Sequence, residues 1–251
     1  MHADCLSPAS GLSLVADKGH TMHDLRNYKV EPPGPVTLRG RFVTLEPYEA
    51  ERHLQALWEG LGGQEINALT RYFPNDDFTG VEDFGKWLEA ARTDGKYVTL
   101  VFRDNEGGRI VGMASYMRPD PKNGVVEVGA VAHAPDIQRS PLTTEAHYLM
   151  ARHVFEDLGY RRYEWKCHND NAPSRRSAVR YGFTFEGVFR QHVISKGANR
   201  DTAWFSMIDG EWPVLKQAFG AWLMPQNFDE TGGQRRRLED IRDEIRSGAA
   251  Q

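Results

Sequence analysis

The stretch Gln138–Ala146 brings together residue types that suit the binding of an anion. It follows a strand-like run, Val125–Ala132, and opens a helix-like run, Leu142–Leu158. A helix that begins directly after a strand points its free backbone N–H groups into one small volume, where phosphate is a favoured ligand. The sequence therefore predicts a phosphate site at this turn.

The turn is unusual because it lacks the glycines that let a backbone approach a phosphate closely. Ser140 is a suitable N-cap, and Pro141 gives up one N–H donor while its φ suits the first helical position. Arg139 adds a positive charge to the predicted phosphate site, and Thr143 and Thr144 add hydroxyl groups. The remaining backbone N–H donors belong to Arg139, Ser140, Leu142, Thr143 and Thr144. An ordinary capped helix start is the alternative, which Ser140 and Pro141 also explain.

Composition excludes several classes of protein. A chain of 251 residues has room for one core with appendages. The formal net charge of −4 argues against a general nucleic-acid binder and gives a weak preference for a cationic acceptor. No apolar run reaches the roughly 20 residues of a membrane span and no signal-peptide pattern is present, so the cytoplasm is the expected location. Cys5 and Cys167 form neither a disulfide framework nor a metal site, and Cys167 is expected to be a packed thiol.

Three segments differ in their patterning. Residues 1–35 are expected to form an arm, because they show no sustained period and end in the proline-rich run Glu31–Pro35. A globular domain is expected over residues 36–225. Residues 226–251 form a polar tail, in which Arg235–Arg246 has apolar residues at helical spacing. This part of the tail is either a docking helix or a solvated charged helix.

Within the globular part, strand patterns and helix patterns alternate. Strands or hairpins are expected over Val36–Pro47, Lys96–Arg103, Arg109–Arg118, Asn123–His133, Arg162–Cys167, Phe183–Ser195 and Thr202–Ile208. Helices are expected over Tyr48–Gly60, Val81–Thr93, Leu142–Leu158, Ala172–Tyr181 and Glu211–Leu223. The connection Leu61–Gly80 is typical of a substrate lid or of a packed loop. This order predicts a mixed α/β (α+β) domain in which an antiparallel meander leads to a β-α-β unit.

Three passages resemble the GCN5-related N-acetyltransferase (GNAT) family, and most closely its branch of ribosomal-protein N-terminal acetyltransferases. They are Glu127–Ala146, Asn171–Gly187 and Arg200–Thr202, and the resemblance covers about residues 36–225. In the first passage, Gln138 and the run Thr144-Glu145-Ala146 match the family's turn and helix start. Pro141 and Thr143 stand where the family has two glycines.

This resemblance implies the single-domain GNAT fold, acetyl-CoA as donor and a primary amine as acceptor. The pantetheine arm of the family lies between the fourth and fifth strands, and a backbone N–H near Val131 would polarise the thioester carbonyl. Gln138 would belong to the pyrophosphate turn and Asn171 would bind the pantetheine amide. Asn171 is equally suited to cap the following helix, and it can do both only if its side chain divides its donors and acceptor.

The acceptor amine has to lose a proton, because only about one lysine-like amine in a thousand is neutral at pH 7. The resemblance suggests Glu127 as the base, since several family members carry a glutamate at this place on the fourth strand. A strand-surface glutamate that faces water or pairs with an arginine is the alternative. His133, at the end of the same strand, is the second choice.

The departing thiolate can take a proton from the enzyme or leave unaided. The tyrosine that much of the family uses as acid is replaced here by Ala178, and Ser174 matches a serine with this role in the ribosomal-protein branch. Ser174 is also suited to a local hydrogen bond in the first helical turn. Val193 stands where that branch has a carboxylate, which increases the weight on Glu127.

The sequence thus predicts an N-acetyltransferase that works by direct attack of a bound amine. Two rivals stay open, a non-catalytic acyl-CoA-binding regulatory module and an interaction domain that has lost the cofactor. The acceptor is a protein or peptide N-terminus, an aminoglycoside-like molecule, a polyamine or an amino acid. No nucleic acid or membrane partner is expected, and a homo-oligomer is left open. Leu61–Gly80, the loop Lys196–Arg200 and the N-terminal arm are expected to shape the acceptor pocket.

Overall fold

One mixed β-sheet organises the protein, whose computed structural model describes residues 25–138 and 140–248. Its strands are β1 (Leu38–Arg39), β2 (Val43–Pro47), β3 (Val98–Asp104), β4 (Ile110–Asp120), β5 (Val125–His133), β6 (Arg162–His168), β7 (Thr184–Ser195) and β8 (Ala198–Ile208). They lie in the order β1-β2-β3-β4-β5-β6-β8-β7. Among these described strands, the pair β5–β6 alone is parallel.

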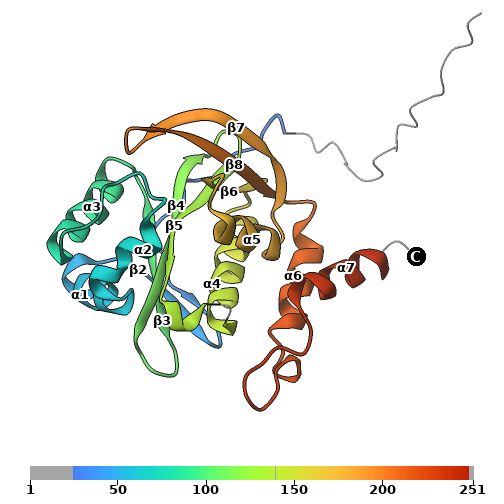
Figure 1. The fold of residues 1–251 in the computed structure, drawn as a ribbon. Helices are drawn as coiled ribbons and strands as arrows, with labels where there is room; N and C mark the ends of the chain where they lie inside the picture. The colour runs from blue at the N-terminus through green and yellow to red at the C-terminus, as the bar shows by residue number, and fades with distance from the viewer. Residues whose placement is uncertain (1–24, 139, 249–251) are drawn as a thin grey trace, which may run out of the picture.

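Helices cover both faces of the sheet (Figure 1). They are α1 (Ala50–Gly60), α2 (Ile66–Thr70), α3 (Val81–Thr93), α4 (Pro141–Arg152), α5 (Ala172–Arg180), α6 (Trp212–Trp222) and α7 (Leu238–Gly248). The first three lie on one side of the sheet and the last four on the other (Figure 1). Within the described parts of the chain, each helix is too short or too polar to cross a bilayer. The predicted mixed α/β fold with its β-α-β unit is confirmed.

Two expected loops turn out to contain more regular structure. The connection Leu61–Gly80 holds a 3₁₀ turn, η1 (Gly63–Glu65), and the helix α2, which is too short to show a helical period in the sequence. The loop expected at Lys196–Arg200 is a tight hairpin turn at Lys196 and Gly197, because both residues have positive φ angles (49° and 75°) that suit a two-residue turn. Strand β8 therefore begins earlier than expected.

Each face of the sheet has its own apolar core. On the α4 side, Leu149, Tyr163 and Trp222 are fully enclosed, and α7 adds Leu238 and Ile241 with 2% and 5% of their surface exposed. On the other side, α1 and α3 contribute residues such as Leu57, Phe84 and Leu88. The tail segment is therefore a docking helix and not a solvated one.

A buried carboxylate fixes the start of α4 against the edge of the sheet. Glu145 Oε1 accepts from the backbone N–H of Arg41 at 2.8 Å, and its Oε2 accepts from those of Phe42 and Val43 at 2.6 and 3.1 Å. A Cβ at Gly40 would lie 2.4 Å from this carboxylate, so only glycine permits the contact. These bonds hold the beginning of α4 against the segment that joins β1 to β2.

Candidate active site

The parallel strands β5 and β6 separate halfway along their length. Their registered pairs run from Val125–Arg162 to Val128–Trp165 and then stop, although both strands continue. Ala130 has a φ of 51°, and the register with β4 shifts beside it, which marks a β-bulge that bends β5. A cavity of about 730 Å³ occupies the opening and is lined by the β5 backbone from Gly129 to His133.

The lining of this cavity falls into two parts. The strand end has charged and aromatic side chains from the sheet, from the connection before β3 and from the connection after α2, namely Tyr72, Tyr97, Arg118, Glu127, Lys166 and Arg200. The helix end has side chains from the start of α4, from α5 and from the C-terminal segment, namely Gln138, Thr143, Arg176, Arg180, Gln234 and Arg237. The two ends differ in how their charges are held.

Glu127 lies at the strand end with 3% of its surface exposed. Its Oε2 accepts from Arg118 Nη1 at 2.9 Å and from Lys166 Nζ at 3.0 Å, whereas its Oε1 has no hydrogen-bond partner among the described residues. The expected alternative of a glutamate paired with an arginine is therefore present for one oxygen. The other oxygen is free to meet a ligand in the cavity.

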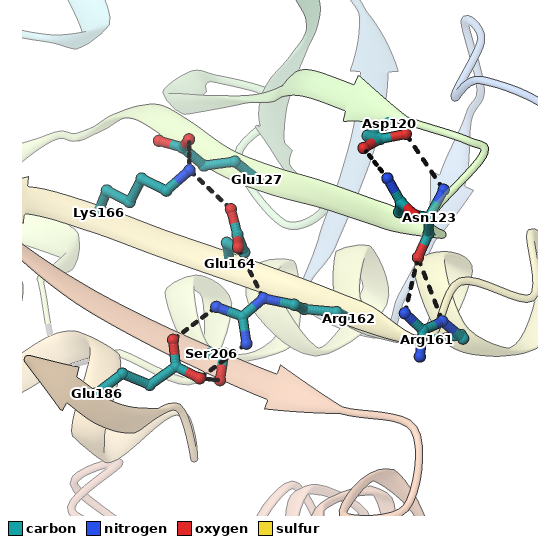
Figure 2. Close-up of polar contacts among 9 residues, drawn as sticks. All are labelled: Asp120, Asn123, Glu127, Arg161, Arg162, Glu164, Lys166, Glu186 and Ser206. Atoms are coloured by element: carbon teal, nitrogen blue, oxygen red, sulfur yellow. Dashed lines mark hydrogen bonds and ion pairs between the residues drawn. The ribbon is translucent and has the colours of Figure 1, made fainter. Parts of the chain in front are cut away.

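A chain of ion pairs continues from Glu127 across the same face of the sheet, as Figure 2 shows. Lys166 Nζ also lies 2.7 Å from Glu164 Oε2, and Arg162 connects Glu164 to Glu186. The hydrogen bonds to Glu186 are the main reason that the pKa of Arg162 is raised. Because side chains alternate between the two faces of a strand, Arg162, Glu164 and Lys166 lie on the same face of β6. Their ion pairs fix the position of the lysine that holds Glu127.

His133 lies inside the cavity wall and not on a solvated loop. Its Nε2 is 3.3 Å from Nε2 of His147, so one ring donates and the other accepts. Burial lowers the pKa of His133 to about 4 and that of His147 well below its ordinary value. A neutral ring of such low basicity is a poor proton acceptor, which argues against the expected role of His133. Tyr181 stacks on His147 at 4.5 Å and is buried, as expected of a core residue.

The turn before α4 is capped as the sequence indicates. Ser140 Oγ accepts from Thr143 N–H, and Ser140 O accepts from Thr144 N–H, both at 3.4 Å. The hydroxyls of Thr143 and Thr144 also donate to Ser140 O, so they are turned into the helix and away from the expected phosphate role. Both N–H bonds are longer than a typical N–H···O hydrogen bond. Gln138 and Thr143 line the cavity, Leu142 is buried in the core, and Arg139 lies outside the described residues.

The start of α5 brings two predicted residues to the cavity. Asn171 Oδ1 accepts from Ser174 N–H at 3.1 Å and caps the helix, while its Nδ2 has no partner among the described residues. Capping and cofactor binding are therefore compatible. Ser174 Oγ accepts from Trp165 Nε1 at 2.9 Å, and a side-chain hydrogen bond also connects Ser174 to the Cys167 thiol. Burial raises the pKa of the neighbouring Cys167 thiol, a packed thiol as expected.

The connection after α2 and the tip of the β7–β8 hairpin meet over the strand end. The Tyr72 hydroxyl donates to the Asp170 carbonyl at 3.1 Å, and the Tyr72 ring lies 5.2 Å from His168, another residue of the cavity wall. Lys196 Nζ donates to the Arg71 carbonyl at 3.3 Å. Two of the segments that were expected to shape the pocket, the Leu61–Gly80 connection and the hairpin tip, are therefore in contact at one end of the cavity.

Several cations of the site were not singled out from the sequence. Arg180 lies over the ring of Trp222 at 5.0 Å and donates to Thr144 Oγ1 at 3.0 Å, which fixes its guanidinium at the helix end. Arg237 reaches the cavity because α7 docks. Lys166 could have been found, because it alternates with the apolar Trp165 and Cys167 on a predicted strand. Nothing in the local sequence indicates the position of Arg237.

Comparison with known proteins agrees with this geometry. The family model described as acetyltransferase (GNAT) domain matches residues 43–184, which is more than half of the chain. A GCN5-related N-acetyltransferase from Brucella melitensis is 44% identical and superposes with a TM-score of 0.82, covering 87% of this chain and 100% of that chain. A GNAT-family structure from Chromobacterium violaceum ATCC 12472 is 31% identical with a TM-score of 0.68, covering 84% and 100% of the two chains. The chain belongs to the GNAT family of acetyltransferases, which use acetyl-CoA as the acyl donor.

A curated relative points to the same branch as the sequence. The ribosomal-protein-serine acetyltransferase of Escherichia coli (strain K12) is 27% identical over 109 residues, which are 43% of this chain and 59% of that protein. The chain thus spans less than two thirds of the length of this relative. The predicted family and acetyl donor are confirmed, and the relatives leave the acceptor open.

Proposed function

We propose that the protein acetylates a primary amine, which directly attacks acetyl-CoA bound in the cavity between β5 and β6. The separation of these strands after Val128 and Trp165 is the observation that carries the proposal. Beyond this point the β5 backbone from Gly129 lines a cavity and has no registered partner on β6. A pantetheine arm can bond to such an edge in the way that an added strand does.

The helix end suits the phosphates of the cofactor. The N-terminus of α4 presents backbone N–H groups, and Arg176, Arg180 and Arg237 supply positive charge around it. The thioester then lies towards the strand end, where a backbone N–H near Val131 can bond to its carbonyl oxygen. In this proposal Asn171 Nδ2, which has no partner among the described residues, bonds to the pantetheine amide.

Glu127 is the proposed base. Its Oε1 accepts a proton from the amine, while Arg118 and Lys166 hold its Oε2. The amine nitrogen forms a bond to the acetyl carbon, and the C–S bond then breaks. The CoA thiolate takes a proton from Ser174, whose hydroxyl is oriented by Trp165, or from water.

The relatives suggest a protein N-terminus as one form of the acceptor, because the Escherichia coli relative is named for a ribosomal-protein serine. A small amine is the other form. Both present a primary amine to the same base, so the chemistry at Glu127 is common to them.

The proposal is tested by measuring thiol release from acetyl-CoA with a panel of amines, alongside a calorimetric titration with CoA. We expect saturable binding of CoA and thiol release with at least one amine. Binding without thiol release from any amine would support the non-catalytic module instead. A complete lack of CoA binding would contradict both readings.

A further inference from the structure

The cavity has many more cations than anions, although the chain as a whole has a formal net charge of −4. Among the described lining residues, the charged side chains are Arg118, Lys166, Arg176, Arg180, Arg200, Arg237, Glu127 and Glu239. The phosphates of CoA account for the arginines at the helix end. The strand end has no phosphate to bind, so its cations require another explanation.

Two of the three cations at the strand end already have carboxylate partners. Lys166 lies between Glu127 and Glu164, and Arg118 pairs with Glu127. Arg200 differs from them. It forms no ion pair among the described residues, and its Nε is buried without a hydrogen-bond partner. Its neighbour across the hairpin is the apolar Val193, which cannot supply one.

The electrostatic surroundings of Arg200 favour an anion. Burial lowers the pKa of Arg200 and outweighs the opposite effect of Cys167 and Glu127, while repulsion from Arg118 acts in the same direction as burial. Arg118 and Arg200 both line the cavity. An anion between the two guanidinium groups reduces their repulsion and replaces the hydration that Arg200 loses on burial. The planar fork of a guanidinium matches the two oxygens of a carboxylate.

We propose that the acceptor is a primary amine that also carries a carboxylate, with Arg200 and Arg118 binding the carboxylate while Glu127 Oε1 faces the amine. This inference rests on the proposed amine acetylation and names its substrate class. A free amino acid and a peptide with an acidic residue near its N-terminus both offer this pair of groups. The local charges thus reverse the weak preference for a cationic acceptor that the net charge indicates.

The test compares acceptors that differ only in the carboxylate. One arm uses α- and ω-amino acids beside their amides, and the other uses peptide amides that begin Ser-Glu or Ser-Gln. We expect kcat/KM to be roughly tenfold or more higher for the acid than for its neutral match in at least one arm. The arm that shows this ratio identifies the source of the carboxylate. Ratios near or below one in both arms would overturn the inference.

Two variants connect the preference to Arg200. Arg200→Gln is expected to bring the acid-to-amide ratio close to one while acetyl-CoA affinity, measured by calorimetry, is retained. Arg200→Glu is expected to raise kcat/KM for diamines relative to amino acids. Arg190→Gln, an exposed arginine on the other arm of the hairpin, is the matched control. An equal loss of turnover with every acceptor in Arg200→Gln would show a role towards the thioester and contradict acceptor recognition.

These outcomes separate the inference from the function on which it rests. Acetylation of neutral and acidic amines at equal rates contradicts the carboxylate site alone. Acetyl-CoA binding without acetylation of any amine contradicts the proposed function itself. The wild-type ratios decide the question even if an Arg200 variant fails to fold.

Discussion

The two ends of the cavity hold their charges in different ways. At the strand end, Lys166 bonds to Glu127 in the cavity wall and to Glu164 behind it, so these positions are fixed by the register of β5 and β6. At the helix end, Arg180 is held by stacking on Trp222, and Arg237 comes from a segment beyond the family match, which ends at residue 184.

This difference indicates which parts of the site are rigid and which depend on docking. A carboxylate on a paired strand keeps its geometry when the cofactor leaves, which suits proton transfer. A phosphate is bound mainly by charge and tolerates longer or more mobile contacts. We therefore expect changes at the strand end to affect turnover and changes at the helix end to affect cofactor affinity.

The largest effect is expected from Glu127→Gln. Loss of the base should lower kcat by about 100-fold or more, with acetyl-CoA affinity unchanged in calorimetry. Glu164→Gln is the matched control, because Glu164 bonds to the same Lys166 Nζ and does not belong to the described cavity lining. An equal loss in both variants would show that the ion-pair chain, and not Glu127 as a base, supports turnover.

An intermediate effect is expected at the helix end. Arg237→Gln should raise KM for acetyl-CoA by roughly three- to tenfold and leave kcat unchanged, since one charge-assisted contact is lost. Because Arg237 is proposed to meet a phosphate, the variant should not change the kinetics with S-acetylpantetheine, which has none. Arg235→Gln, in the same segment, is the control. An equal defect with both donors would contradict the assignment of this end.

The smallest effect concerns the buried pair of His133, in the cavity wall, and His147 behind it. Burial holds the pKa of His133 at about 4 against an ordinary value of 6.5. Between these two pH values the histidine is protonated in the unfolded chain and neutral in the folded protein. The contribution of the neutral buried ring to the free energy of unfolding is therefore complete above about pH 6.5 and is lost as the pH falls towards 4.

Denaturant unfolding across this pH range measures the effect. His133→Asn should show a flatter fall in the free energy of unfolding between pH 6.5 and 4 than the wild type. His192→Asn, which removes an exposed histidine, is the control. Parallel curves for His133→Asn and the wild type would show that the buried pair does not contribute.

Local patterns in the sequence were enough to place the elements that build the site. The strand and helix on either side of Gln138 predicted a capped turn at the cavity, and the resemblance to the GNAT family assigned Asn171 and Ser174, at the start of a predicted helix, to the site. These features depend on neighbouring residues along the chain. The helix α2 was missed because its five residues are too few to show a period.

Features that depend on distant contacts were not predicted. Arg237 reaches the cavity only because Leu238 and Ile241 dock against the core. An arginine partner for Glu127 was one expected alternative, but its second partner, Lys166, depends on the register of neighbouring strands and was not predicted. The low pKa of His133 depends on burial beneath segments that lie far away in the sequence. Such facts follow from packing and not from local patterns.

A crystal structure of the complex with CoA tests the central claim most directly. We predict that the pantetheine arm lies between β5 and β6, with the sulfur near Glu127 and the pyrophosphate against the turn Gln138–Thr144 within reach of Arg237. A pyrophosphate bound away from this turn, or a pantetheine arm outside the opening between the two strands, would contradict the account.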